Sequence, residues 1–240
     1  MEHLRTWLAA ESPDIVALQE TKIQDHEFPV AALEDAGYRV AYAGQKSYNG
    51  VAILSKRPAS VLADAIPGFD DSQRRVMAVR LDQLVILNLY VPNGSSVDSD
   101  KYDYKLDWLA ALTDYVEHLA IEHEALILLG DFNIAPEDRD VHDPDAWRGK
   151  VLVSEPERTA LTKLQAVGLA DAFRLFEQSG DGFSWWDYRA GGFRRNRGMR
   201  IDLILVSAAL ARNCIRCVVD QTPRRWDKPS DHAPVVVEFA

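Results

Sequence analysis

Four acidic residues stand at the edges of short apolar stretches, a placement from which side chains could do chemistry. They are Glu20, Asp131, Asp202 and Asp231, and Asn133 and His232 lie within two residues of two of them. One such acid is a turn residue more often than not, but four in one chain predict a shared site. Carboxylates that converge in a low-dielectric cleft repel one another, so the arrangement needs a cation. All-oxygen ligands favour magnesium or manganese over zinc.

Short strands and a few helices must position these side chains. Apolar and β-branched runs between turn residues predict strands at 14–19, 38–43, 51–54, 76–81, 84–91, 125–129, 201–206, 214–220 and 235–239. Helical spacing predicts one helix that carries Leu4, Trp7 and Leu8, and others at 27–36, 101–122 and 158–167. Proline, glycine and alternating charge make 138–150 an expected surface loop.

The connection between 76–81 and 84–91 indicates the kind of sheet. Two residues cannot hold a crossover helix, so these strands must be antiparallel. The predicted fold class is α/β (α+β), a four-layer sandwich of two packed mixed β-sheets flanked by helices. The sequence shows no repeat, low-complexity tract or linker, so residues 1–240 are expected to form a single domain.

Composition limits the function classes. No apolar run approaches the roughly 20 residues of a membrane helix. The N-terminus does not resemble a signal or transit sequence, so we expect a cytoplasmic protein. Cys214 and Cys217 are the only cysteines, and their C-x-x-C spacing lies on a predicted strand without a second pair. Two reduced thiols are therefore expected rather than a zinc site.

Charge is unevenly distributed along the chain. The net charge of −10 argues at first against a nucleic-acid partner. Two basic stretches nevertheless stand out: Arg194, Arg195, Arg197 and Arg200, and then Arg224, Arg225 and Lys228. Either could be a solvated loop, but the first follows an aromatic-rich segment, which suits a loop that contacts phosphates.

Four motifs, in order, resemble those of the exodeoxyribonuclease III family, which belongs to the endonuclease/exonuclease/phosphatase superfamily. They are Gln19-Glu20-Thr21-Lys22, Gly130-Asp131-Phe132-Asn133, Asn196-Arg197-Gly198-Met199-Arg200-Ile201-Asp202 and Ser230-Asp231-His232-Ala233-Pro234. Gly-Asp-x-Asn with Ser-Asp-His alone marks only the superfamily. The segment 183–189 and the Lys-Pro-Ser-Asp-His-Ala-Pro ending are typical of the DNA-repair branch. The similarity runs from about Trp7 to the C-terminus.

The resemblance implies a magnesium-dependent hydrolase, with manganese as a possible substitute. In such an enzyme Glu20 would hold the divalent ion on an oxygen of the scissile phosphate. Asp231 would be a further metal ligand, and Asp131, Asn133 and His232 would border the same metal site. Asp131 would also orient and deprotonate the attacking water.

The resemblance further assigns the phosphate contacts. Asn133 would donate to the phosphate. His232 would contact a non-bridging oxygen and would be kept cationic by Asp202. Tyr90 would hydrogen-bond the phosphate, with Asn93 close by. Taken singly, Asp202 could merely cap a strand and Tyr90 could be an ordinary half-buried tyrosine; the agreement in order and spacing favours the catalytic interpretation.

A lesion pocket also follows from the resemblance. Trp185, Met199 and Ile201 would line a narrow apolar pocket that accepts a flipped abasic sugar and excludes a nucleotide that keeps its base. Lys22, Lys46 and Arg197 would contact the DNA backbone. The implied activities are incision 5′ of abasic sites and 3′→5′ removal of nucleotides or blocked 3′ ends. The expected partner is double-stranded DNA, and the expected state is a cytoplasmic monomer that joins the nucleoid when it acts.

Two other functions remain open at this point. A phosphatase or sphingomyelinase of the same superfamily would keep Glu20, Asp131, Asn133 and His232 but would give no reason for Trp185. A DNA-binding protein without catalysis is the other alternative, since family members open with a strand of the type Ile-x-Thr-Trp-Asn. This chain begins at the helix that follows such a strand. We therefore expect Met1 to be an internal methionine of a longer product.

Overall fold

The computed structural model describes residues 1–178 and 180–240. The strands are β1 (Ile15–Gln19), β2 (Arg39–Ala43), β3 (Val51–Ser55), β4 (Ser60–Ala63), β5 (Val76–Leu81), β6 (Leu84–Tyr90), β7 (Ala125–Asp131), β8 (Leu169–Asp171), β9 (Asp202–Ser207), β10 (Cys214–Val219) and β11 (Val235–Phe239). The α-helices are α1 (Glu2–Glu11), α2 (Val30–Glu34), α3 (Asp100–Glu122), α4 (Pro144–Trp147), α5 (Glu155–Ala166) and α6 (Ala208–Ala211). Short 3-10 turns lie at Asp25–Glu27, Asp138–Asp140, Ala172–Leu175, Arg189–Gly191 and Pro223–Arg225.

A six-stranded sheet with the order β4-β5-β6-β7-β9-β8 forms the centre of the fold. β5 and β6 form the predicted antiparallel pair, whereas β6 and β7 run parallel because α3 connects them. β9 is antiparallel to β7. The register places Tyr90 opposite Asp131 and Asp131 opposite Asp202. Three residues from distant parts of the sequence therefore lie side by side at one end of this sheet.

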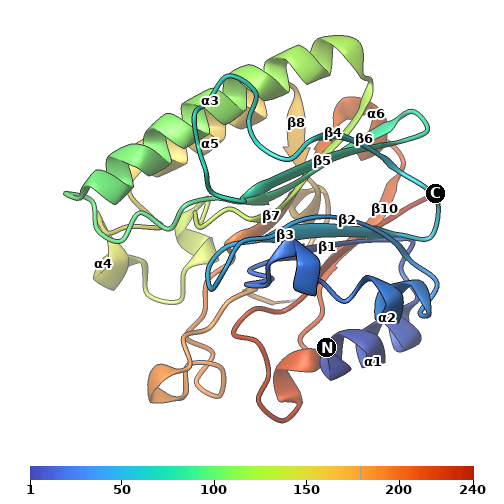
Figure 1. Cartoon of the computed structure of the whole chain (residues 1–240). Helices are drawn as coiled ribbons and strands as arrows, with labels where there is room; N and C mark the ends of the chain where they lie inside the picture. The colour runs from blue at the N-terminus through green and yellow to red at the C-terminus, as the bar shows by residue number, and fades with distance from the viewer. Residues whose placement is uncertain (179) are drawn as a thin grey trace.

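A second layer of strands packs on one face of the six-stranded sheet (Figure 1). It consists of a three-stranded sheet, β1-β3-β2, and a separate β10-β11 pair. The predicted architecture of packed sheets between helices is confirmed, but this layer is two hydrogen-bonded sheets rather than one. In the described part of the chain, β1 pairs only with β3 and β11 pairs only with β10.

Helices cover the two outer faces of these layers (Figure 1). α3 and α5 pack on the six-stranded sheet through a core that includes Trp108, Leu112 and Leu161. α1 and α2 pack on the three-stranded sheet through Leu8 and Leu33. A third apolar cluster fills the space between the two sheets. Burial of apolar surface on both faces of each strand layer holds the site end of the sheets in place.

Several element boundaries differ from the expected ones. The helix expected at 27–36 is a 3-10 turn followed by α2, which begins at Val30 after Pro29. α5 begins at Glu155 rather than Arg158, because Ser154 and Glu157 form a capping box. β4 and β8 were not predicted, and both are short edge strands. The expected surface loop 138–150 contains a 3-10 turn, α4 and the buried residue Asp140.

No helix in the described part of the chain is long and apolar enough to cross a membrane.

Candidate active site

The site is built where strands of both layers end. Tyr90, Asp131 and Asp202 are adjacent in register on β6, β7 and β9 of the six-stranded sheet. Glu20 follows β1 of the three-stranded sheet, and the Tyr90 hydroxyl donates a hydrogen bond to its Oε1. His232 reaches Asp202 from the loop before β11. The structure thus brings together the five residues that the sequence predicted from separate motifs.

Asp131 is the buried centre of this group. Its side chain accepts hydrogen bonds from the Asn133 backbone N–H (2.9 Å) and from Asn133 Nδ2 (3.0 Å). His232 Nε2 lies 4.0 Å from Asp131 Oδ2. Gly130 belongs to β7 and has φ 134°, and a Cβ there would lie 2.0 Å from the Leu89 carbonyl oxygen. Only glycine therefore allows β7 to approach β6 closely enough to place Asp131 beside Tyr90.

Two asparagines complete the polar wall next to Asp131. Asn133 has φ 49°, in the left-handed region that asparagine tolerates better than most residues. Its Nδ2 also donates to the Val91 carbonyl (3.0 Å), and its Oδ1 accepts from Asn93 Nδ2 (2.9 Å). Asn93 thus lies close to the site, as predicted. Both amide hydrogens of Asn133 have partners within the protein, so the side chain is held in one orientation.

Asp202 and His232 form a charged pair. His232 Nδ1 lies 2.9 Å from Asp202 Oδ2, and Ser184 Oγ donates to the same oxygen at 2.6 Å. Ser184 Oγ also accepts the backbone N–H groups of Ile201 and Asp202. Sequence reasoning missed this role of Ser184, although it lies within the aromatic segment 183–189. Its hydroxyl fixes the carboxylate that orients the histidine.

Burial and charge oppose each other at both central groups, and the pKa of each is raised overall. Burial raises the pKa of Asp131 to about 7, although the nearby His232 charge lowers it. Burial alone would lower the pKa of His232, but the charge and hydrogen bond of Asp202 outweigh it and raise that pKa to about 10. At neutral pH, His232 is therefore cationic, and Asp131 is poised close to its titration point.

Glu20 and Lys22 form the outer part of the site. Both have left-handed backbones, with φ 52° and 54°, which are strained for residues other than glycine. Lys22 Nζ lies 2.7 Å from Glu20 Oε2. Burial would raise the pKa of Glu20, but hydrogen bonds from Lys22 and Tyr90 lower it overall. The carboxylate is therefore ionised and half-exposed, as a cation ligand must be.

The oxygen and nitrogen donors of the site determine whether it can hold a divalent cation. Among the described residues, no three His, Cys, Asp or Glu side chains are arranged to hold a metal ion together. Among the five predicted ligands, which are Glu20, Asp131, Asn133, Asp231 and His232, the four acidic and imidazole side chains do not form such a cluster, and the ligand assignment stays a prediction. Magnesium is commonly held by one or two carboxylates with waters and substrate phosphate completing the shell. The ionised oxygens of Glu20 fit that mode of binding.

The three predicted pocket residues cluster beside the site. Trp185 and Met199 pair through reciprocal backbone hydrogen bonds of 2.9 Å. Met199 and Ile201 are buried in one apolar cluster, and the half-buried Trp185 packs against it. Trp185 Nε1 donates to Asp231 Oδ2 (3.1 Å). The tryptophan is the member of this group that reaches the solvent side, and Asp231 fixes its ring.

The basic stretches divide into exposed and buried arginines. Arg194, Arg195 and Arg197 are exposed, as a loop that contacts phosphates would require. Arg200 was expected in the same loop, but its side chain is 1% exposed and is bound by the carboxylates of Asp140 and Asp171. The expectation for Arg200 was wrong, because its side chain faces the interior while its neighbours Met199 and Ile201 pack in another cluster.

Arg224, from the second basic stretch, is also buried rather than solvated. Its guanidinium lies 4.9 Å from the Phe193 ring centroid and 5.7 Å from that of Trp186, and it donates to the Ser230 carbonyl. It therefore joins the aromatic segment to the loop that carries Asp231 and His232.

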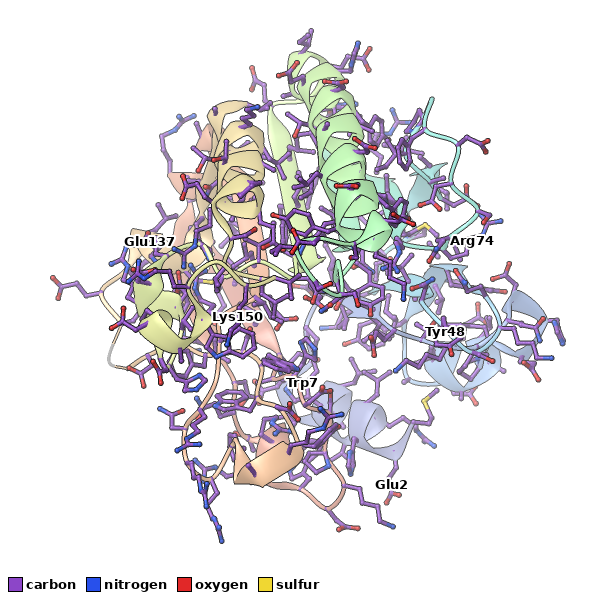
Figure 2. The ribbon with its side chains drawn as sticks, turned by 90° about the vertical axis from the view of Figure 1, so that its left-hand side faces the viewer. Glu2, Trp7, Tyr48, Arg74, Glu137 and Lys150 are labelled. Carbon is purple, nitrogen blue, oxygen red and sulfur yellow. The ribbon has the colours of Figure 1, made fainter. Side chains whose placement is uncertain are left out.

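An exposed lysine lies on a loop that contacts the Lys22 side of the site. Lys46 is exposed on the loop between β2 and β3, three residues before Asn49, whose carbonyl binds the Lys22 backbone N–H. Figure 2 shows Tyr48 and Arg74 on one side of the molecule, with Glu137 and Lys150 toward the other side. The net negative charge of the chain thus coexists with basic residues beside the site.

A buried ion pair that was not predicted supports the two asparagines. Lys105 on α3 and Glu157 on α5 are both 0% exposed and hydrogen-bond each other. Lys105 Nζ also donates to the carbonyls of Asn133 (2.7 Å) and Asn93 (3.2 Å). All three ammonium hydrogens therefore have acceptors. No local motif signals this pair, because its partners are far apart in the sequence.

Comparison with known proteins identifies this arrangement. The endonuclease/exonuclease/phosphatase family profile matches residues 1–232. The chain belongs to this family. It is 38% identical to "Exodeoxyribonuclease III" of Haemophilus influenzae over 95% of this chain and 90% of that protein. The predicted membership of the exodeoxyribonuclease III branch, and with it an exodeoxyribonuclease III-like hydrolase, is thereby confirmed.

Solved structures of this family agree with the fold. A 3′ phosphatase, NExo, from Neisseria, bound to a product DNA hairpin, superimposes with a TM-score of 0.94 at 42% identity, covering 100% of this chain and 93% of that one. An AP endonuclease from Archaeoglobus fulgidus superimposes with a TM-score of 0.93 at 35% identity, covering 98% and 92%.

Proposed function

We propose that this chain is a Mg²⁺-dependent DNA-repair phosphodiesterase, with Mn²⁺ as a possible substitute. It would remove nucleotides or blocked 3′ ends from duplex DNA in the 3′→5′ direction and incise 5′ of abasic sites. The observation that carries the proposal is the adjacency of Tyr90, Asp131 and Asp202 in register, with Glu20 and His232 closing the group. The DNA-bound Neisseria relative and the AP endonuclease relative support the substrate class.

In this proposal Asp131 is the general base. Its buried carboxylate is the group of the site whose pKa lies near neutrality, which suits proton abstraction from water. Asn133 Nδ2 keeps the carboxylate in place through the 3.0 Å hydrogen bond. The attacking water would lie against Asp131, and its proton would pass to the free carboxylate lone pair.

The cationic groups would stabilise the phosphate. His232, held protonated by Asp202, would donate from Nε2 to a non-bridging oxygen. Tyr90 would turn its hydroxyl from Glu20 to the phosphate, with Asn93, which is hydrogen-bonded to Asn133, close by. A divalent ion on Glu20, with Asp231 nearby, would polarise the phosphate and offset the charge of the transition state. Lys22, Lys46 and Arg197 would position the DNA backbone.

The pH dependence of cleavage tests the proposed roles of Asp131 as the base and of His232 as the neighbouring cation. Asp131 must be ionised to act, so we expect activity to rise with pH along a limb at or below about pH 7. The His232 charge lowers the pKa of Asp131, so His232→Gln should move that limb to higher pH. Single-turnover rates from pH 5 to 9 measure both. An unmoved limb in His232→Gln would contradict the proposed coupling.

Trp185 is proposed as the wall that selects abasic sites, with Met199 and Ile201 behind it. Trp185→Ala should reduce the ratio of cleavage at abasic sites to cleavage at undamaged internal nucleotides by roughly 10-fold or more, because the size barrier is lost. Trp147→Ala is the matched control, since Trp147 packs on the same apolar cluster. Gel assays on paired duplexes measure the ratio. An equal change in both variants would refute the selective role of Trp185.

The substrate class is tested by one panel. The protein is offered an abasic duplex, a recessed 3′ end, a 3′-phosphate end, an inositol phosphate and sphingomyelin, each with Mg²⁺. Cleavage of the DNA substrates is expected. Hydrolysis of the inositol phosphate or sphingomyelin with the abasic duplex left uncut would replace this function by that of a phosphatase or sphingomyelinase.

The proposal extends to partners, domain organisation and location. Double-stranded DNA is the proposed partner, residues 1–240 form one catalytic domain, and the protein acts as a monomer. A cytoplasmic location, with association to the nucleoid during repair, is inferred from the exodeoxyribonuclease relatives.

A further inference from the structure

A buried amide crosses between the two sheets directly behind the site. Asn88 lies in β6 between Leu87 and Leu89, and all three residues are 0% exposed. Asn88 Nδ2 donates to the carbonyls of Leu18 (2.8 Å) on β1 and Ala52 (2.9 Å) on β3. Its Oδ1 accepts from Gln19 Nε2 at 2.6 Å. Every hydrogen-bonding group of the amide thus has a partner on the opposite sheet.

These partners lead directly to Glu20. Gln19 is the residue before Glu20 and the last of β1, and Tyr90 is two residues beyond Asn88 on β6. Because side chains alternate along a strand, Asn88 and Tyr90 project from the same face of β6 toward the three-stranded sheet. Asn88 binds the end of β1, and Tyr90 binds the carboxylate that follows it.

The core that surrounds Asn88 between these sheets is apolar. Val51 and Ile53 of β3 pack against Met77, Val79 and Ile86 of the six-stranded sheet. Apolar packing is non-directional, so it tolerates small shifts between layers, whereas hydrogen bonds have narrow distance and angle requirements. The Asn88 contacts therefore define the position of β1 relative to β6 more sharply than the surrounding core does.

Tyr90 cannot replace this connection during the reaction. Its hydroxyl carries one hydrogen, which binds Glu20 in the structure. When that hydrogen turns to the phosphate, as proposed above, the Tyr90–Glu20 contact is lost. The hydrogen bonds of Asn88 do not involve Glu20 itself and would remain.

We propose that Asn88 is a positioning residue, which holds β1 against β6 so that the Glu20 carboxylate stands at a set distance from Asp131. The inference rests on the proposed function, in which Glu20 holds the divalent cation. Asn88 touches neither the substrate nor the cation and acts through Gln19 and Leu18. Removing the amide would leave the Gln19 amide and the carbonyls of Leu18 and Ala52 without this partner.

The test uses Mn²⁺ binding to the full chain without DNA, measured by calorimetry or by the electron paramagnetic resonance of free Mn²⁺. Asn88→Leu removes all three hydrogen bonds at similar volume. Asn88→Asp keeps the shape but turns the Nδ2 donor into an acceptor that faces two carbonyls. We expect both variants to weaken Mn²⁺ binding by roughly 10-fold, the scale known for residues that orient metal ligands.

Catalysis provides a second readout. At fixed Mg²⁺, kcat on an abasic duplex should fall by roughly 10-fold in both variants, while KM for the duplex changes by less than about twofold. Ser207→Ala is the matched control. Ser207 Oγ donates a hydrogen bond to the Glu124 carbonyl and accepts one from the Leu126 N–H. Ser207 ends β9, whereas the site residue Asp202 begins it. The Ser207→Ala variant should lower thermal stability and leave Mn²⁺ affinity and kcat unchanged.

The possible outcomes are distinct. If both Asn88 variants keep wild-type Mn²⁺ affinity and kcat, with only a lower melting temperature, Asn88 is structural and the positioning role is wrong. If Glu20→Gln binds Mn²⁺ as the wild type does, the assignment of Glu20 as the metal ligand fails, and the inference falls with it. Weaker binding in the Asn88 variants and in Glu20→Gln, with Ser207→Ala unchanged, supports it.

Discussion

Asp131→Asn is expected to lower the single-turnover rate on an abasic duplex by about 10²- to 10⁴-fold, the range of general acid–base catalysis. The amide has the same shape as the carboxylate but cannot accept a proton from water. Binding should persist, since the groups assigned to the phosphate and the DNA backbone are untouched. Rates at saturating enzyme, with affinity measured separately in Ca²⁺ or EDTA, distinguish loss of chemistry from loss of binding.

The same substitution should leave the protein folded, so the loss of activity cannot be attributed to unfolding. Burial raises the pKa of Asp131 in the folded state to about 7, against 3.8 for a solvated aspartate, so the folded state binds more protons between these values. Stability due to this group is therefore lost as pH rises through that window. Asparagine avoids this cost but turns one acceptor into a donor facing Asn133.

We therefore expect the melting temperature of Asp131→Asn in EDTA at pH 8 to lie within about 4 °C of the wild type, or roughly 1–2 kcal/mol. The melting temperature of Asp131→Asn, relative to that of the wild type, should be higher at pH 8 than at pH 5. A variant that keeps more than about a tenth of wild-type activity would contradict the assignment of Asp131 as the base.

Lys105→Met is expected to destabilise the protein by about 3–5 kcal/mol, the cost of breaking a buried ion pair from one side. The methionine leaves the Glu157 carboxylate buried at 0% exposure and leaves two carbonyls, those of Asn93 and Asn133, without their donor. Burial already lowers the pKa of Lys105, against the opposing effect of Glu157. Burial of the Lys105 ammonium therefore costs free energy, but its removal costs more when Glu157 stays in place.

Urea unfolding at pH 7 measures this loss as a shift in midpoint at constant slope. Arg148→Met is the matched control, because Arg148 and Asp145 form a pair with side chains 70% and 92% exposed, which contributes little. The double variant Lys105→Met/Glu157→Leu should recover part of the loss, since it removes the stranded charge. If Lys105→Met lowers the free energy of unfolding by less than about 1 kcal/mol, the buried ion pair does not stabilise the fold as proposed.

The site was largely predictable because its residues carry local signals. Glu20, Asp131 and Asp202 each stand next to an apolar run, and strand ends that meet at one edge of a fold bring such residues together. The register that places Asp131 between Tyr90 and Asp202 depends on strand order, which no local pattern encodes. The family resemblance assigned roles to these residues but did not give the strand order.

The features that the sequence did not predict depend on contacts between residues that are distant in the sequence. Arg197 and Arg200 look alike in the sequence, but only the fold reveals that two buried carboxylates bind Arg200. Lys105 is one of several polar residues in an amphipathic helix, and its partner Glu157 is on another helix. For Asn88 the sequence does contain a signal, because it is a polar residue in the middle of the apolar run 84–91.

Several expectations stay predictions. They include the single domain, the monomeric state, the cytoplasmic location, the Mg²⁺ dependence and the catalytic and metal-binding roles of individual residues. The lesion pocket is supported by the cluster of Trp185, Met199 and Ile201, but its selectivity rests on the substrate comparison above.

Cleavage of a 5′-labelled duplex that carries one abasic site, with Mg²⁺ and with EDTA, tests the proposed function most directly. We expect Mg²⁺-dependent incision on the 5′ side of the site that leaves a 3′-hydroxyl, with Asp131→Asn nearly inactive. Incision that persists in EDTA, or a 3′ end left as an unsaturated sugar by elimination, would contradict hydrolysis by this site.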